Sequence, residues 1–300
     1  MNKKRVLIII ILILLLFTAC NETSKDEKSP EEEKSQEEEK ALDQEEVLDQ
    51  ETTQGDQEDE KKLPSLEEIR DRYEDQVPVE WGERVTGVKT RIDTEERIVA
   101  LTFDACGGPN GRGYDEELIE VLIEMDIPAT LFISGDWMEQ HSQRVLELWE
   151  KPNFDIANHG KDHKPLSVNG KSAYGIPGTD SVEEVYQEVY ENHLKIKALT
   201  GDSPKFFRSG TAYYDEVAVK IIKDLGEIPV NYNVLGDAGA TFSAAQIYES
   251  MMQAKPGSIM LFHMNHPHSD VAEGVKIGIE ALLEEGFEFV LLKDYMEELE

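Results

Sequence analysis

The sequence has few cysteines, few basic residues and only one long hydrophobic run. Its two cysteines, Cys20 and Cys106, allow at most one disulfide. The chain carries 30 Lys and Arg against 63 Asp and Glu, for a formal net charge of -33. Nucleic acids and anionic membrane surfaces are bound through clustered Lys and Arg, so we expect neither as a partner.

The hydrophobic run spans residues 6–17 and follows the basic residues 3–5. Its 12 residues are fewer than the ~20 that span a bilayer. With the small residues that follow, it predicts a signal peptide over 1–19, an uncleaved membrane anchor being the alternative. Residues 16–20 resemble a bacterial lipoprotein signal, which implies a diacylglycerol on Cys20 and anchoring outside the cytoplasmic membrane. Cys106 is then the only free thiol, and no disulfide can form within the mature chain.

An acidic stretch follows, and we assign residues 20–62 to a tether. Residues 21–62 hold 18 acidic and 6 basic side chains, no aromatic residue and no apolar run. Such a segment cannot bury enough apolar surface to offset its ordering entropy, so we expect a solvated, extended spacer. A specific acidic binding tail is the alternative.

Beyond the tether, residues 63–95 form an N-terminal extension, either a helical cap or a second linker, and residues 96–300 form an α/β domain. Short apolar runs predict strands at Ile98–Phe103, Ala129–Ile133, Phe154–Ala157, Lys205–Phe207, Pro229–Val234, Ser258–Phe262 and Phe287–Leu292. Apolar residues at helical spacing predict helices at Asp115–Met125, Glu183–Leu199, Asp215–Leu225, Ala244–Ala254 and Val271–Glu285. This alternation indicates a parallel sheet, and seven strands favour closure into a barrel, with a flat doubly wound sheet as the alternative.

Within this domain, the sequence indicates where helices begin and end and where titratable side chains gather. Asp115 and Asp215 are predicted to cap helix starts, and Gly226 and Gly286 to follow helix ends. Titratable residues collect where predicted strands end, at Asp104, His159, Arg208, Asp237 and His263. In a parallel barrel these positions share one mouth, so we expect the five side chains to meet there.

His159 and His163 are four residues apart, a spacing that lets two imidazoles reach one metal from a tight loop. With the strand-end residues they resemble the NodB-homology polysaccharide deacetylases, carbohydrate esterase family 4. The likeness covers roughly Glu96 to Glu300 and runs in motif order: Thr102-Phe103-Asp104, His159 with His163, residues 208–214, Gly236-Asp237-Ala238 and Leu261-Phe262-His263. The third segment lacks the family's proline, and the fourth lacks its tryptophan.

The resemblance implies a distorted (β/α)7 barrel that removes N-acetyl groups from a β-1,4-linked glycan with a divalent metal, usually zinc. It implies Asp104 as the general base, held by Arg208, and His263 as the general acid. His159 and His163 would be metal ligands, and Asp237 is interpreted as a residue that orients Arg208.

One departure affects the metal site, because Ala105 stands where the family has its second aspartate. Catalytic zinc sites typically use three protein ligands plus water. Asp104 is our third-ligand assignment, which moves the base role to another carboxylate such as Asp162. Cys106 thiolate is an alternative, although a buried apolar role is favoured for it.

His266 or His268 are further candidate ligands, although a place at the rim is favoured for them. The last alternative is a site without metal. Trp137, Tyr213 and Tyr214 either stack on sugar rings or pack internally.

The sequence therefore predicts a lipid-anchored, monomeric hydrolase that deacetylates peptidoglycan or another cell-envelope glycan. A non-catalytic glycan-binding protein of the same fold is the first alternative, in which Ala105 marks a lost metal. A hydrolase of a non-sugar amide is the second, because a fold does not fix its substrate.

Overall fold

The computed structural model describes residues 62–109 and 111–300. The predicted signal peptide, Cys20 and all of the predicted tether except Lys62 lie outside these residues. Among the described residues, no helix combines the length and the apolar character that crossing a bilayer requires.

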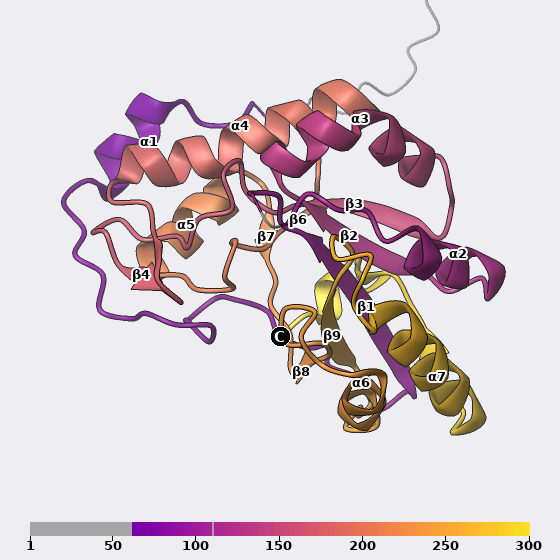
Figure 1. Cartoon of the computed structure of the whole chain (residues 1–300). Helices are drawn as coiled ribbons and strands as arrows, with labels where there is room; N and C mark the ends of the chain where they lie inside the picture. The colour runs from indigo at the N-terminus through magenta and orange to yellow at the C-terminus, as the bar shows by residue number, and fades with distance from the viewer. Residues whose placement is uncertain (1–61, 110) are drawn as a thin grey trace, which may run out of the picture. The chain divides into compact units, whose positions relative to one another are not determined.

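A parallel sheet forms the centre of the described chain (Figure 1). Its strands follow the order β7-β6-β3-β2-β1-β9-β8, and β10 pairs with the beginning of β1. The bounds are β1 Ile98–Ala105, β2 Ala129–Ile133, β3 Phe154–Asn158, β6 Phe206–Phe207, β7 Ile228–Pro229, β8 Val234–Leu235, β9 Ser258–His263 and β10 Glu288–Phe289. A separate antiparallel hairpin consists of β4 (Ser172–Ala173) and β5 (Ile176–Pro177).

The sheet is curled into an incomplete barrel. β7 and β8 lie at opposite ends of the strand order, yet only residues 230–233 connect them. Six strand spacings would separate the edges of a flat sheet by roughly 29 Å. Because this connection reaches at most roughly 18 Å, the sheet must curl to bring its edges together. The predicted distorted (β/α) barrel is confirmed, and the flat sheet is excluded.

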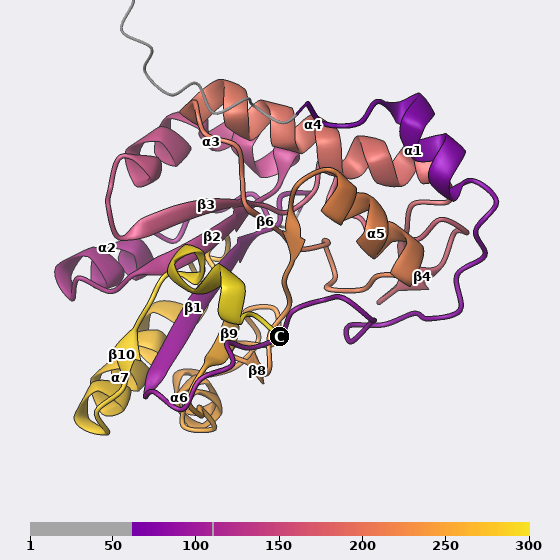
Figure 2. The same cartoon turned by 180° about the vertical axis from the view of Figure 1, so that it is seen from behind.

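The N-terminal extension joins the edge strand β7 to the beginning of β9. The backbone N–H of Lys89 donates to Pro229 in β7 at 2.8 Å, and that of Asn231 donates to Lys89 at 2.7 Å. Further along, the N–H of Ile92 donates to Gly257 just before β9 at 2.8 Å. Figure 2 shows this indigo segment passing close to the C-terminus. The extension is therefore not a linker, and it is more than a helical cap, because its backbone completes the barrel wall.

Helices pack around the sheet close to their predicted positions. They are α1 Leu66–Tyr73, α2 Glu116–Glu124, α3 Gly135–Trp149, α4 Val182–Thr200, α5 Glu216–Asp224, α6 Ala244–Met251 and α7 Val271–Glu284, followed by the 3-10 helix η1 Leu292–Glu298. Asp115 and Asp215 cap α2 and α5 through their side chains, as predicted. Gly226 and Gly286 follow α5 and α7 with φ of 80°, a left-handed conformation that glycine adopts without steric cost.

Three features differ from the sequence-based expectations. The predicted strand Pro229–Val234 is wrong, because β7 ends at Pro229 and β8 begins at Val234, on the other edge of the sheet. Helix α3 was not predicted, because the polar residues 139–144 separate its apolar residues; His141, within this polar stretch, departs from helical geometry. The short helix α1 was also not identified; its Ile69 and Tyr73 pack with residues of α4 and α5.

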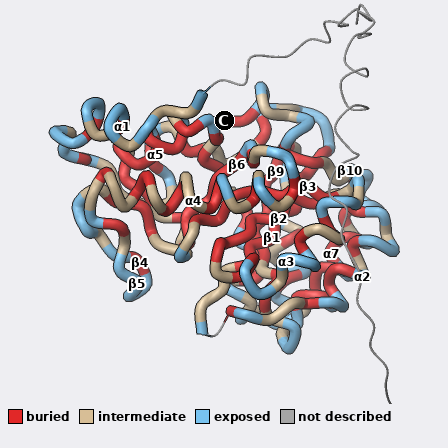
Figure 3. Tube along the Cα trace, turned by 90° about the horizontal axis from the view of Figure 1, so that it is seen from above, coloured by how far each residue is buried: buried red, intermediate tan, exposed pale blue. Residues whose placement is uncertain are grey.

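Strand β1 places polar side chains on the interior side of the barrel. All eight of its residues are buried, and Figure 3 shows the central strands in red. Leu101, Phe103 and Ala105 belong to the core cluster shared with α2 and α7. Thr102 and Asp104 alternate with them and therefore face the barrel interior. Ala105 thus points into the outer core, away from the side on which Asp104 lies.

Candidate active site

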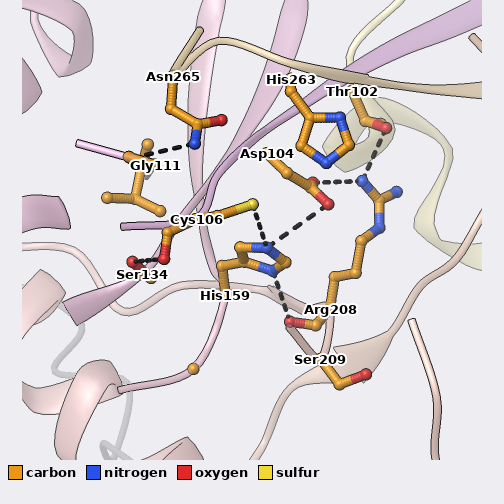
Figure 4. Close-up of polar contacts among 12 residues, drawn as sticks. Thr102, Asp104, Cys106, Gly111, Ser134, His159, Arg208, Ser209, His263 and Asn265 are labelled. Atoms are coloured by element: carbon orange, nitrogen blue, oxygen red, sulfur yellow. Dashed lines mark hydrogen bonds and ion pairs between the residues drawn. The ribbon is translucent and has the colours of Figure 1, made fainter. Parts of the chain in front are cut away.

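Strand-end side chains meet at the carboxyl ends of the central strands (Figure 4). Asp104 in β1 is the register partner of His263 in β9. His159 directly follows β3, and Arg208 directly follows β6. A cavity of about 650 Å³ opens above them, with Asp104, His263 and Cys106 among its lining residues.

Arg208 holds the Asp104 carboxylate in a buried ion pair. Its Nη1 donates to Asp104 Oδ1 at 2.7 Å and to Thr102 Oγ1 at 2.9 Å. Its other nitrogens donate to the carbonyl oxygens of Val230 and Asn231, each at 3.2 Å. Because every nitrogen of the guanidinium is engaged, the carboxylate is fixed in orientation and keeps Oδ2 for other partners.

Two histidines and a cysteine form a group suited to a metal ion. One ligand atom each from Cys106, His159 and His163 lie within 4.8 Å of one another. His159 Nδ1 lies 2.9 Å from the carbonyl oxygen of Arg208. A carbonyl only accepts, so Nδ1 carries the proton and Nε2 presents its lone pair to the group. In Figure 4 the Cys106 sulfur points toward this nitrogen, at 3.8 Å.

The loop that carries His159 and His163 is held by a buried carboxylate of α4. Glu188 Oε1 accepts the backbone N–H groups of Asp162 and Lys164, each at 3.0 Å. Gly160 has φ +80°, and a Cβ there would meet Glu188 Oε1 at 2.4 Å. A tight turn at this position therefore needs glycine, and the turn directs both imidazoles to one side.

Neighbouring groups control the charge of Cys106. Burial disfavours the thiolate, but His163 and His263 outweigh this effect and hold the pKa of Cys106 well below its usual range. The sulfur therefore favours the anionic form that binds metals.

Asp237 orients His263, not Arg208 as predicted. Its Oδ1 lies 2.9 Å from His263 Nδ1, and its Oδ2 accepts the backbone N–H of His263 at 2.6 Å. The reason is topological: Asp237 follows β8, which pairs with β9, whereas Arg208 follows β6 near the opposite edge. Burial disfavours a charged His263, but Asp237 and Cys106 raise its pKa well above the usual value.

Other candidate residues lie elsewhere. Asp162 is exposed and binds Glu188 through its backbone. His266 and His268 line a different cavity, of about 430 Å³. Trp137 and Tyr214 are completely buried, so both pack internally.

Glu188 was missed in the sequence. It carries no motif signal, since an acidic residue in an amphipathic helix usually faces solvent.

Comparison with known proteins identifies the family of this barrel. The model described as polysaccharide deacetylase matches residues 91–228. This segment belongs to the polysaccharide deacetylase family. The family predicted from the motifs is therefore confirmed, and the matched residues include Asp104, His159, His163 and Arg208 of the site.

Two relatives of this chain carry the word deacetylase in their names. A bifunctional xylanase/deacetylase from Pseudobutyrivibrio xylanivorans is 22% identical over 214 residues, covering 71% of this chain and 33% of that protein. This chain therefore spans about a third of that relative's length. A chitooligosaccharide deacetylase from Rhizobium leguminosarum bv. phaseoli is 24% identical over 176 residues, covering 58% of this chain and 71% of that protein.

A solved structure shares the fold of this chain. It is a pseudoenzyme of carbohydrate esterase family 4 from Bacillus anthracis, with a TM-score of 0.58 and 21% identity. The superposed region covers 72% of this chain and 70% of that chain.

We predict that Glu188→Gln reduces the pH dependence of stability. Burial raises the pKa of Glu188 to about 7 against its hydrogen bonds, above the unfolded value of 4.5. The folded state then binds the extra proton, so stability falls as pH rises from the unfolded pKa through the folded one. The loss amounts to about 3 kcal/mol. Glutamine keeps an oxygen for both backbone N–H groups without this loss.

Denaturant unfolding at about pH 5 and about pH 8, with chelator present, measures the effect. Glu191→Gln on the same helix is the control, because Glu191 pairs with Lys161 at the surface. An equal loss in wild type and Glu188→Gln would show that Glu188 does not titrate as described.

Proposed function

We propose that this domain is a metal-dependent hydrolase that removes N-acetyl groups from an amino-sugar glycan of the cell envelope. The observation that carries the proposal is the Cys106, His159 and His163 group. It lies beside a carboxylate fixed by Arg208 and an imidazole fixed by Asp237. One site thus combines a place for a cation, a base and an acid.

The donor set fits a divalent metal of the zinc type. A thiolate and two imidazoles are ligands that zinc favours, and three protein ligands leave a position for water or substrate. The mutually close ligand atoms belong to Cys106, His159 and His163, and Asp104 is not among them, which disfavours Asp104 as the third ligand. Cys106 instead takes the position that Ala105 cannot fill. We therefore prefer Cys106 over our sequence-based choice of Asp104.

A divalent ion in this site would act as a Lewis acid toward the acetamide carbonyl and would acidify a water molecule. Asp104 Oδ2, left open by the ion pair with Arg208, accepts the proton from the attacking water. His263, kept protonated by Asp237, donates from Nε2 to the nitrogen of the leaving amino sugar. The products are acetate and a free amine, and both proton transfers are accounted for.

A glycan-binding protein without catalysis is the second candidate, favoured by Ala105 and by the pseudoenzyme of the same fold. The two candidates differ in metal binding, because a relic site would lack a third ligand. The non-sugar amide alternative differs in substrate only.

We predict that the purified protein with zinc releases acetate from N-acetylglucosamine oligomers or from peptidoglycan. Asp104→Asn keeps an oxygen for Arg208 but loses the base, so kcat/KM falls about 10²- to 10⁴-fold. Asp71→Asn, at an exposed position of α1, is the matched control. Absence of acetate from every N-acetylated substrate would remove the proposal of deacetylation.

We predict that Cys106 is a metal ligand. Cobalt-loaded protein should show sulfur-to-cobalt charge-transfer absorption in the near ultraviolet, which Cys106→Ser abolishes while weakening metal binding at least ~10-fold. Cys106→Asp should hold about one equivalent of metal without this absorption. His159→Ala should bind none. Unchanged affinity in Cys106→Ser would place the third ligand elsewhere.

The proposed location is outside the cytoplasmic membrane, with Cys20 as lipid anchor. Two acyl chains hold a protein stably at a bilayer. In bacterial cells the wild-type chain should fractionate with membranes and enter the detergent phase, and Cys20→Ala should move it to the aqueous phase. The same partitioning of both proteins would contradict the anchor.

A further inference from the structure

One wall of the 650 Å³ cavity comes from outside the barrel strands. Glu83 and Arg84 of the N-terminal extension line it, together with Tyr174 and Ile176 of the β4–β5 hairpin. The extension and the hairpin are about ninety residues apart in the sequence. They meet beside the same cavity that Asp104 lines, so the cavity extends beyond the reacting groups.

Tyr174 is an exposed aromatic residue held in a costly conformation. Its side chain is 73% exposed, and its backbone has φ +52°, which a residue with a Cβ rarely adopts. The hydroxyl donates to Glu83 Oε1 at 2.9 Å. The ring meets Tyr213 edge-on, with centroids 5.4 Å apart, and Tyr213 contacts Trp81 at 5.6 Å. Strained residues that the surroundings hold in place cluster at ligand sites.

This wall is connected rigidly to the reactive centre. Gly82 and Tyr214 exchange two backbone hydrogen bonds, of 3.1 and 3.0 Å. Asn231 Nδ2 donates to the backbone carbonyl of Glu83 at 2.6 Å, while the Asn231 carbonyl accepts from Arg208. A ligand on Tyr174 would therefore be held at a fixed position relative to Asp104.

We propose that Tyr174 and Glu83 form a subsite for a second sugar of the glycan chain, beside the sugar whose acetamide reacts. The assignment rests on the proposed function, because it takes the substrate to be an N-acetylated sugar chain. The face of an aromatic ring covers the apolar C–H face of a pyranose, and a carboxylate accepts sugar hydroxyls. Binding at a distance from the reacting group also positions that group.

The subsite predicts a dependence on chain length. An N-acetylglucosamine pentamer reaches both the reacting position and Tyr174, whereas the monomer occupies one position only. Tyr174→Ala should weaken pentamer binding about tenfold and leave monomer binding unchanged. Tyr174→Phe keeps the ring and loses only the bond to Glu83, so it should lose less than Tyr174→Ala.

Calorimetric titration of the full chain with the pentamer, with chelator present to prevent turnover, measures this directly. Tyr248→Ala is the control, because Tyr248 is an exposed tyrosine of α6 that does not line the cavity. Thermal unfolding of each variant checks that the wall remains folded.

Pentamer binding that is equal in wild type and Tyr174→Ala overturns the subsite and leaves the proposed function intact. If wild type binds neither the pentamer nor peptidoglycan fragments, the glycan substrate and the subsite both fail. Weakened binding in Tyr174→Ala supports the subsite even where no acetate is released, which separates it from the catalytic proposal.

Discussion

The buried ion pair between Asp104 and Arg208 requires the curled sheet. In the strand order, β2 and β3 separate β1 from β6, so a flat sheet would hold the two residues roughly 14 Å apart. Curling lets the Arg208 side chain cross the interior and meet Asp104 at 2.7 Å. A buried charge without its partner costs about 3–5 kcal/mol. Opening the sheet would separate Arg208 from Asp104 and leave each charge without its partner. The ion pair therefore stabilises the curled sheet, and the curled sheet holds the carboxylate in its orientation.

Much of this arrangement could be predicted, because buried parallel strands are apolar runs and reactive groups follow them. Asp104, His159 and His263 were found in this way. The path from β7 to β8 was not, because Pro229–Val234 looks like one continuous strand although its ends belong to opposite edges. Strand pairing is a long-range property, and apolar patterning reports only local burial. The same limit explains why Asp237 was assigned to the wrong partner.

The choice of Cys106 as the proposed third ligand could not be made from the sequence, which offered it only as an alternative to Asp104, and the reason is geometric. Ala105 and Cys106 are adjacent, and which of them faces the histidines depends on where β1 ends and how its chain turns. The structure buries Ala105 against α2 and α7 and turns the sulfur of Cys106 toward His159. A thiolate is softer than a carboxylate and favours zinc over magnesium or manganese. Under the proposed assignment, Cys106 in place of the aspartate would change the metal preference without requiring that the metal be lost.

The N-terminal extension contributes both to the barrel wall and to the wall of the cavity. Lys89 bonds to β7 and completes the barrel wall, and six residues earlier Glu83 lines the cavity beside Tyr174. Both positions lie on a segment that its own sequence does not distinguish from a linker. Because the same backbone closes the sheet and lines the cavity, changes that loosen its hydrogen bonds to β7 or to Gly257 before β9 should also move the cavity wall. The site thus forms where segments that are distant in the sequence meet in the closed barrel. The strand-end motifs account for Asp104 and His263, but not for the cavity wall that contains Glu83 and Tyr174.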